Sequence, residues 1–250
     1  MSRSCVVIGS GRAGGSFHAA LGEVGWAIEM VAARSLLDGV DDVLADVDIG
    51  SADLVLLTVP DGAIAAVAQA VPATGAVVAH VSGVCDLGVL APHERVGSIH
   101  PLMSLPDATT GSRRLLDSCT FAVDGDALVA EVADALGGRA IHVPASSRAL
   151  YHATAAVAAN HLVALCAQVE SLAGEVGVPI DAYWTMMRTT LDNVAESGAG
   201  SSLTGPAARG DWDTVRAHVA ALPTDDDRTL YLALCEAAAR LAGRKLPDLD

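Results

Sequence analysis

Aromatic side chains are scarce in this chain of 250 residues, which holds three tryptophans, three tyrosines and two phenylalanines. Unpaired nucleic-acid bases stack on such side chains, so the composition argues against a base-stacking surface. Positive charge is also scarce, since 15 lysines and arginines stand against 30 aspartates and glutamates, giving a formal net charge of −15. Phosphate groups are repelled by such a chain, and we expect no nucleic-acid partner.

Cysteines are few and follow no pattern. The five cysteines are odd in number, widely spaced and mostly set in apolar runs, which is typical of reduced thiols in a protein core. No spacing typical of metal ligands is visible, so no metal is predicted. The N-terminus also lacks the basic region, apolar stretch and cleavage site of a signal peptide, which favours a cytoplasmic protein.

Long uninterrupted apolar runs are missing as well. Polar side chains interrupt the most apolar region, residues 149–172, and they are His152, Asn160, His161, Gln168 and Glu170. We therefore expect a buried helix there and no membrane partner. The hydrophobic content of 52% still suffices for a sizeable core, and the length of 250 residues allows two domains.

The segment from Ser4 to Leu21 predicts a strand, a tight turn and a helix. A β-branched run stops at Gly9, and Gly9, Gly11 and Gly14 form the pattern G-x-G-x-x-G before apolar residues follow at helical spacing. Gly9 permits the sharp turn, Gly11 lets the backbone approach a pyrophosphate, and Gly14 lets the helix pack against the strand. In this setting the pattern predicts a bound dinucleotide.

The end of the second predicted strand, residues 28–32, indicates which dinucleotide binds. A carboxylate at this place binds a ribose 2′-hydroxyl, whereas an arginine accommodates a 2′-phosphate. The chain has Arg34 and Ser35 here, so NADP(H) is the predicted cofactor, the alternative being a solvated loop arginine. At the helix start, Arg12 and Ala13 are further predicted contacts of the phosphates.

Strand and helix patterns then alternate up to residue 148. Further strands are predicted at residues 53–59, 76–81, 96–99, 120–123 and 140–143, and helices at 36–47, 62–70 and 127–136. We therefore predict a Rossmann-type α/β domain over residues 1–148, with a doubly wound parallel sheet. From residue 149 the apolar period is helical, and residues 149–250 are predicted to form an all-helical second domain, with helices around 181–196, 214–222 and 229–241.

Polar residues follow several predicted strands, at the edge where parallel sheets bind ligands. Val59 and Pro60 are expected beside the nicotinamide, while Asp61 is as readily a plain helix cap. Ser82 is a predicted cofactor contact and His100 a predicted substrate contact. For both, the alternative is a structural role in holding their loops.

The predicted helical domain holds three groups of polar residues that are candidates to line a cleft. In the first group, Tyr151 precedes His152, and two steps of four residues lead from His152 to Asn160, so these side chains share overlapping faces of one helix. The other two groups are residues 189–193, with Asn193, and the loop 203–211, with Thr204, Arg209 and Asp211.

Together these motifs resemble a family of Rossmann-like proteins whose C-terminal helical domain long carried only an unknown-function label. The resemblance covers essentially the whole chain and rests on the glycine pattern, Val59-Pro60-Asp61, Ile99-His100-Pro101-Leu102, Tyr151-His152-Ala153, Asn160 and residues 203–211. That family is similar in layout to ketopantoate reductases, pyrroline-5-carboxylate reductases and 3-hydroxyisobutyrate dehydrogenases. The resemblance implies an NADPH-dependent reductase that forms a homodimer through its helical domain, and for some members ketopantoate reduction in pantothenate synthesis.

The sequence departs from these relatives at the proton donor. Ketopantoate reductases and hydroxyacid dehydrogenases use a lysine one helical turn before an asparagine, but position 156 here is alanine, and the single lysine, Lys245, lies near the C-terminus. His152 is therefore the predicted proton donor, because an imidazole with a pKa of about 6.5 can protonate an alkoxide near neutral pH. Asn160 is expected to hold the carbonyl oxygen.

Arg209 is predicted to bind a substrate carboxylate bidentately, with Asp211 orienting its guanidinium. Asn193 and Thr204 are further predicted substrate contacts. Plainer alternatives are a helix cap, a bridge between helices or a structural ion pair. The predicted reaction is reduction of a small 2-oxo acid, with ketopantoate favoured. The alternatives are reduction of a cyclic imine or another 2-oxo acid, and binding of NADP(H) without turnover.

Overall fold

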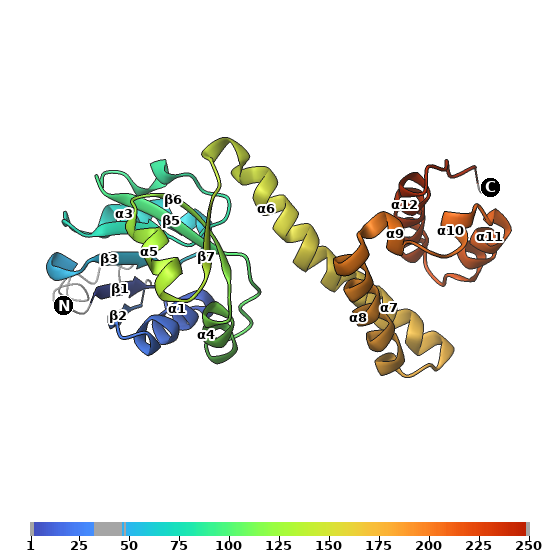
Figure 1. Cartoon of the computed structure of the whole chain (residues 1–250), viewed down its shortest axis with the longest axis horizontal. Helices are drawn as coiled ribbons and strands as arrows, with labels where there is room; N and C mark the ends of the chain where they lie inside the picture. The colour runs from blue at the N-terminus through green and yellow to red at the C-terminus, as the bar shows by residue number, and fades with distance from the viewer. Residues whose placement is uncertain (1–2, 33–46, 48, 249–250) are drawn as a thin grey trace. The chain divides into compact units, whose positions relative to one another are not determined.

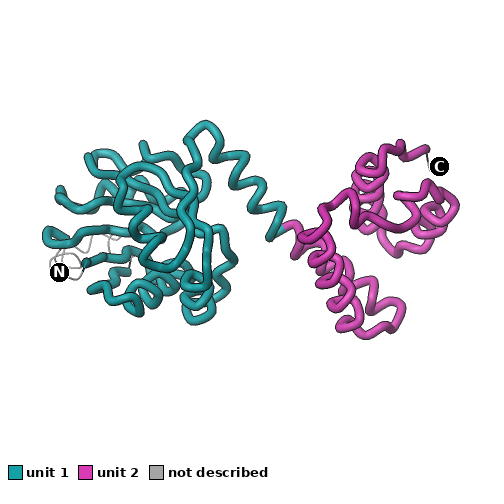
Figure 2. The backbone as a smooth tube through the Cα atoms, in the orientation of Figure 1, with its two compact units in different colours: residues 1–160 teal, residues 161–250 magenta. Residues whose placement is uncertain are grey.

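The computed structural model describes residues 3–32, 47 and 49–248. The chain divides into two compact units, residues 1–160 and residues 161–250 (Figure 2). Residue 148, where the predicted α/β domain ends, is the first residue of helix α6 (Arg148–Ala156). That helix belongs to the first unit, so the compact units divide later in the chain than the predicted domains.

The first unit is built on a seven-stranded sheet in the order β2-β1-β3-β4-β5-β6-β7. Its strands are β1 (Ser4–Ile8), β2 (Ala27–Val31), β3 (Leu54–Leu57), β4 (Val77–His80), β5 (Val96–Pro101), β6 (Thr120–Gly125) and β7 (Arg139–His142). The predicted Rossmann-type α/β fold is confirmed. The sheet is mixed, however, because β5 and β6 pair antiparallel while the other neighbours are parallel.

Helices cover both faces of the sheet (Figure 1). The alternation of side chains along β3 shows why, since Leu54 and Leu56 join one buried cluster and Val55 and Leu57 join the other. The first cluster includes residues of α1 (Arg12–Glu23), α4 (Ala108–Leu116) and α5 (Leu128–Ala135). The second includes residues of α3 (Ile64–Ala70) and of the short helix η3 (Leu87–Leu90). This arrangement is a doubly wound sheet.

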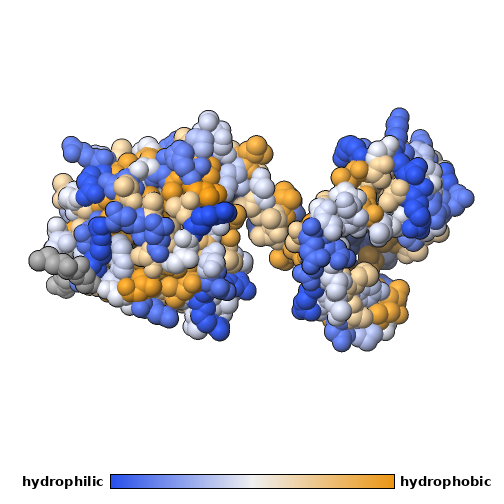
Figure 3. Space-filling model, viewed as in Figure 1, coloured by the Kyte–Doolittle hydropathy of each residue, from blue (hydrophilic) through white to orange (hydrophobic). Residues whose placement is uncertain are grey.

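A long helical stretch begins with α6, passes through a π-helical turn, η5 (Val157–His161), and continues as α7 (Leu162–Val176). The prediction that it is buried is wrong for the single chain, because none of its most apolar 18-residue window is buried. Apolar surface, orange in Figure 3, therefore lies along part of this helix. By length and composition residues 145–176 could cross a membrane, a weak sign because core helices of soluble proteins have the same composition.

The regular secondary structure in the described residues of the second unit is all helical, as predicted. After α7 it contains α8 (Ile180–Ser197), α9 (Ala199–Ser202), α10 (Pro206–Arg209), α11 (Trp212–Ala221) and α12 (Asp225–Leu241). A small core joins the last three helices, in which Ala207, Val215 and Cys235 are buried against Trp212 and Tyr231. These helices include the predicted ranges 181–196 and 229–241 and most of 214–222.

Candidate functional site

The glycine turn between β1 and α1 has the geometry that its sequence predicts. Gly9 has a φ of +119°, and a Cβ there would lie 2.8 Å from the carbonyl oxygen of Thr58. The Thr58 hydroxyl donates hydrogen bonds to the carbonyls of Gly9 (2.8 Å) and Ile8 (3.1 Å), which fixes the turn against the end of β3. A Cβ on Gly14 would lie 1.8 Å from the Gly9 carbonyl oxygen. Only glycine at both positions allows the helix to start this close to the strand.

Gly11 differs from these two glycines because its surroundings are open. No heavy atom lies within 4 Å of the place where its Cβ would stand, and its backbone is extended at φ −73° and ψ −171°. Gly11 is the N-cap of α1, no side chain caps the helix, and the first intrahelical hydrogen bond runs from Gly15 N–H to the Gly11 carbonyl. The N–H groups of Arg12, Ala13 and Gly14 therefore remain for a ligand.

These N–H groups could bind an anion. The first turn of α1 contains no acidic residue, and Arg12 lies exposed at its start. The helix dipole and the unpaired N–H groups both favour negative charge at this end. A diphosphate fits such a site, and the missing side chain at Gly11 leaves it room.

The strands that follow bring further residues to the same edge of the sheet. β1 and β3 pair in parallel, with Ile8 opposite Leu57, so the segment after β3 lies beside the glycine turn. Val59 there is half-buried and Pro60 exposed, while Asp61 opens the short helix η2 (Asp61–Ala63). Val59 and Pro60 thus lie where a nicotinamide cofactor would run along the edge, and their contact with it stays a prediction.

The turn after β4 is held by the side chains of Ser82 and His80. The Ser82 hydroxyl accepts hydrogen bonds from the N–H groups of Val84 (3.2 Å) and Cys85 (3.1 Å). His80 Nδ1 accepts from the Ser82 N–H at 3.2 Å, and its Nε2 lies 3.3 Å from the Asp86 carbonyl. This arrangement suits a neutral ring protonated on Nε2, and burial lowers the pKa of His80 accordingly. The structural role foreseen for Ser82 is therefore present, and its cofactor contact stays a prediction.

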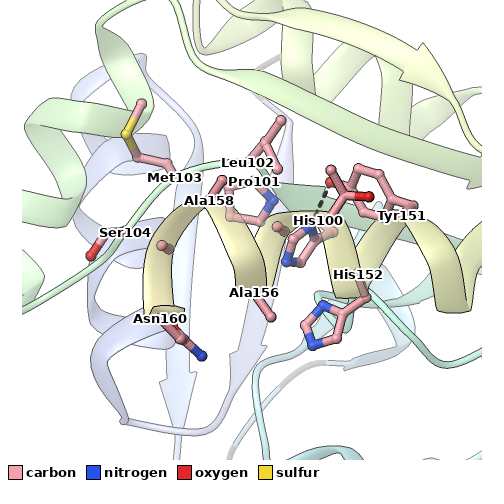
Figure 4. Close-up of a pocket in the computed structure, with 13 residues that line it drawn as sticks. His100, Pro101, Leu102, Met103, Ser104, Tyr151, His152, Ala156, Ala158 and Asn160 are labelled. Atoms are coloured by element: carbon pink, nitrogen blue, oxygen red, sulfur yellow. Dashed lines mark hydrogen bonds between the residues drawn. The ribbon is translucent and has the colours of Figure 1, made fainter. Parts of the chain in front are cut away.

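His100 of β5 lies against two side chains of α6 (Figure 4). Its Nδ1 is 2.8 Å from the hydroxyl of Tyr151, and the two rings meet edge to face at 5.5 Å between centroids. The ring of His152 also meets the His100 ring edge to face, with centroids 5.9 Å apart. A Cβ on Gly83 would lie 3.0 Å from His100 Nε2 and 2.6 Å from His152 Nδ1. Both imidazoles therefore approach the backbone after β4, and only a glycine leaves them this room.

Arg148 is a buried charged side chain whose positive charge acts on His100. Its side chain is only 2% exposed, and its guanidinium donates to the Ser98 hydroxyl and to the Ser82 carbonyl, the latter at 3.5 Å. The Asp124 carboxylate lies 3.9 Å away, while Arg148 Nε has no hydrogen-bond partner among the described residues. The guanidinium thus ties the β4 turn, strand β5 and helix α6 together.

Burial and positive neighbours keep His100 uncharged. Burial, then the charges of His152 and Arg148, lower the pKa of His100 to about 4, against an opposing effect of Asp61. Burial likewise raises the pKa of the Tyr151 hydroxyl. At neutral pH the cluster therefore offers a neutral imidazole hydrogen-bonded to a neutral phenol.

These side chains close one end of a cavity of about 470 Å³ within the first unit (Figure 4). Its walls are mostly apolar, with polar groups gathered at the histidine end and near Asn160. The lining residues are His100, Pro101, Leu102, Met103, Ser104, Tyr151, His152, Thr154, Ala155, Ala156, Ala158, Ala159 and Asn160. Such a volume and composition suit a small organic ligand.

His152 and Asn160 line this cavity together, as their helical spacing predicts. Asn160 belongs to the π-helical turn η5, an element that is often found at functional sites. His152 Nδ1 is buried and has no hydrogen-bond partner among the described residues. A buried polar atom without a partner is a point at which a ligand can bind. The catalytic roles of both residues stay predictions.

The remaining predicted site residues lie in the second unit. Asn193 belongs to α8, Thr204 precedes α10, and both are exposed, as is Arg209 at the end of α10. Asp211 caps α11: it accepts a hydrogen bond from the N–H of Thr214 (3.3 Å) and one from its hydroxyl (2.8 Å). These bonds lower the pKa of Asp211, and the charge of Arg209 lowers it further. A substrate role for this group stays a prediction.

Two predicted residues, Arg34 and Ser35, lie outside the described residues, as does the predicted helix 36–47 except for residue 47. Three residues of the cluster were not predicted as site residues: Arg148, Gly83 and His80. Gly83 directly follows Ser82 at a predicted strand end, which is a signal that sequence analysis can use. Arg148 carries no such signal, because its partners Ser82 and Ser98 are distant in sequence. Among the described residues no group of three or more metal-ligating side chains occurs.

Fold and site together define a class of two-part proteins in which a Rossmann-type α/β unit, with an anion site at its glycine turn, precedes a helical unit. The family model described as a domain of unknown function, DUF2520, matches residues 119–238. The chain therefore combines a Rossmann-type domain with a C-terminal DUF2520 region. No curated protein matches the sequence significantly.

Solved structures with the same fold cover nearly the whole chain. A Bacteroides fragilis protein provisionally described as an NADP oxidoreductase is similar with a TM-score of 0.78 and 19% identity, over 96% of this chain and 98% of that one. A Thermotoga maritima protein is similar with a TM-score of 0.70 and 24% identity, over the same shares. The 1-pyrroline-5-carboxylate reductase of Streptococcus pyogenes is similar with a TM-score of 0.62 and 14% identity, over 96% and 99%. At such identities the similarity establishes the fold.

Proposed function

We propose that this protein is an NADPH-dependent oxidoreductase that reduces a small 2-oxo acid, with ketopantoate the favoured substrate. The observation that carries the proposal is the cluster of His100, Tyr151 and His152 at one end of the cavity, at the sheet edge that also holds the glycine turn. A cofactor bound along that edge can bring its nicotinamide next to a substrate in the cavity.

The residues at the glycine turn fit a dinucleotide. The N–H groups of Arg12, Ala13 and Gly14 have no intrahelical partner, and Gly11 leaves open space in front of them. These groups would hold the diphosphate, and Val59 and Pro60 would line its path to the cavity. NADPH, when bound, supplies the hydride. The preference for NADPH over NADH rests on Arg34 and Ser35.

The cavity residues would bind the substrate and manage its proton. An imidazole of the cluster, with His152 the candidate from the sequence, would give a proton to the oxygen of the reduced carbonyl. Asn160 would hold the carbonyl oxygen, and His100 would contact the substrate beside it. Arg209 would bind the carboxylate with Asp211 in support.

A cyclic imine is the second candidate substrate. The described residues that line the cavity include no lysine or arginine, and most are apolar, which suits an uncharged ring. Proteins of this fold include the pyrroline-5-carboxylate reductase named above and a reductive aminase of Aspergillus terreus that was solved with NADPH, with a TM-score of 0.59 and 15% identity, over 98% and 89%. Binding of NADP(H) without turnover is the remaining alternative.

We propose further that the protein is a cytoplasmic homodimer that pairs through its helical part, with neither a membrane nor a nucleic acid as partner. Large apolar side chains are exposed along α7 and α8, with Val163 68%, Met186 58% and Leu191 51% exposed. A second copy of the chain would remove them from water, and the chain's net charge of −15 opposes nucleic acid.

NADPH consumption by the purified protein tests the function. Ketopantoate, other 2-oxo acids and cyclic imines are offered in turn, and the proposal expects turnover of ketopantoate that collapses in His152→Ala and in Arg209→Ala. Arg216→Ala is the matched control, since Arg216 is an exposed arginine of the same unit whose one ion pair within the described part of the chain is with Asp213 on its own helix. Faster turnover of an imine favours the second candidate. Tight NADPH binding without turnover of any substrate contradicts both.

A further inference from the structure

We propose that Tyr151 and His100 form a proton relay that protonates the reduced substrate, and that His152 holds the reacting atom instead of donating the proton. The inference rests on the proposed function and names the source of the proton within it. It moves proton donation from the residue that the sequence favours to a pair of residues that the fold brings together.

The arrangement around the two histidines separates their roles. His100 Nδ1 has the Tyr151 hydroxyl behind it at 2.8 Å, and its Nε2 faces the backbone at Gly83. His152 Nδ1 is buried with no partner among the described residues. A ring that gives up a proton must recover one, and only His100 has a hydroxyl in place to return it.

The neutral state of His100 makes this second group necessary. With a pKa of about 4, the imidazolium form is populated by roughly one molecule in a thousand at pH 7. A neutral imidazole can give up its Nε2 proton without becoming an imidazolate only if its Nδ1 gains a proton at the same time. The Tyr151 hydroxyl is positioned to supply that proton.

The proton balance closes with solvent. When the hydride reaches the carbonyl carbon, the C=O π electrons move to oxygen, which takes the proton from His100 Nε2. The Tyr151 proton passes to Nδ1, which leaves the ring neutral in its other tautomer and Tyr151 as a phenolate. Solvent water then gives a proton to Nε2 of His100, which is only half-buried, while the Nδ1 proton returns to the phenolate along the same hydrogen bond. One solvent proton is consumed per turnover.

The surrounding charges suit this transfer. Arg148 lowers the pKa of Tyr151 against the effect of burial, so its guanidinium stabilises the transient phenolate. The titratable and charged groups that act on His100 come from three elements: Arg148, Tyr151 and His152 of α6, His80 of β4 and Asp61 of η2. Asp61 is the one carboxylate among them, and it is exposed.

Removal of the Tyr151 hydroxyl tests the relay. In Tyr151→Phe, kcat is expected to fall about 100-fold, as for loss of a general acid, while KM and the Kd for NADPH stay within about twofold. In His100→Asn, kcat should fall by a similar factor. In the double variant kcat should fall no further than in either single variant, because the two residues act as a unit. Unchanged kcat in Tyr151→Phe overturns the relay while the reductase function stands.

The chain offers a matched control in its second unit. Tyr231 places its hydroxyl 2.8 Å from His218 Nδ1, with the rings again edge to face at 5.9 Å. Tyr231→Phe removes the same group from the same kind of pair, which does not line the cavity, and it should leave kcat at the wild-type value. An equal fall in both variants would mean that the hydroxyls only support the fold, and it overturns the relay.

A measurement independent of turnover decides the orientation of the hydrogen bond. Nitrogen-15 NMR of the imidazoles should show His100 neutral from pH 6 to 8 with its proton on Nε2, and loss of the hydroxyl should release this tautomer preference. A proton on Nδ1 would make Tyr151 the acceptor and overturns the relay. This result stands even if no substrate of the panel is reduced, an outcome that counts against the proposed function.

Discussion

Gly11→Asp is expected to separate cofactor binding from folding. The backbone at Gly11 is extended and its Cβ position is free of neighbours, so aspartate fits without strain. Its carboxylate can cap the open N–H groups of α1, which raises the free energy of unfolding by a few tenths of a kcal/mol. The same carboxylate occupies the place of the diphosphate. Two unit charges about 4 Å apart at an effective dielectric constant of 20 repel by roughly 4 kcal/mol, which is about a thousandfold in Kd.

Gly11→Asn is the control for charge. Asparagine adds the same side-chain volume and the same capping oxygen, so the ratio of the two Kd values for NADPH isolates the electrostatic repulsion. Calorimetric titration measures both affinities, and urea unfolding shows that both variants remain folded. NADPH binding to Gly11→Asp with wild-type affinity would refute a diphosphate site at this helix.

Three further predictions concern stability and protonation. Gly14→Ala puts a Cβ 1.8 Å from the Gly9 carbonyl oxygen, so α1 must move off the sheet. We expect the free energy of unfolding, measured by urea titration, to fall by about 3 kcal/mol. An unchanged midpoint of unfolding contradicts this close contact. Burial lowers the pKa of His100 to about 4. Between pH 6.5 and 4 the His100 ring is therefore protonated in the unfolded chain but not in the folded chain. Stability should therefore drop by about 3 kcal/mol between pH 6.5 and 4, and drop less in His100→Asn. Arg148→Met should raise the pKa of His100 in NMR titrations whereas Arg148→Lys should not, and equal values would remove Arg148 as an electrostatic neighbour.

Local sequence patterns were sufficient to predict most of the sheet. The apolar run before Gly9 and the run 53–59 became β1 and β3, because strands buried on both faces leave a continuous apolar signal. The five cysteines are free, as expected of core thiols, and burial raises the pKa of Cys119 to about 11. In these places the tertiary fold reinforces the local preference.

Helix α4 and the direction of β6 were not predicted, for related reasons. Residues 108–116 are mostly small or polar, so their apolar periodicity is faint, although Asp107 caps the helix by accepting from the Thr110 N–H at 2.8 Å. After α4 the chain comes back to the edge of the sheet where β5 ends, and β6 begins there. The 2.8 Å hydrogen bond from the Leu102 N–H to the Thr120 carbonyl shows this. The direction of a strand depends on such a return path, which local sequence does not encode.

The candidate site was predictable only where one element holds its residues. His152 and Asn160 lie on one continuous helical stretch, and helical spacing suffices to bring them to one cavity. The contact of His100 with Tyr151, and of Arg148 with Ser98, joins residues about fifty positions apart. Such contacts arise from the packing of α6 against β5. The sequence therefore favoured His152 as the donor, and the hydrogen bond between Tyr151 and His100 was not predicted.

A crystal structure of the full chain with NADP⁺ tests the central claim most directly. The account predicts diphosphate oxygens within hydrogen-bond distance of the N–H groups at the start of α1, and the nicotinamide ring beside Gly83 with its C4 facing the cavity of His100. A cofactor bound elsewhere, or a nicotinamide directed away from His100 and Tyr151, would contradict it.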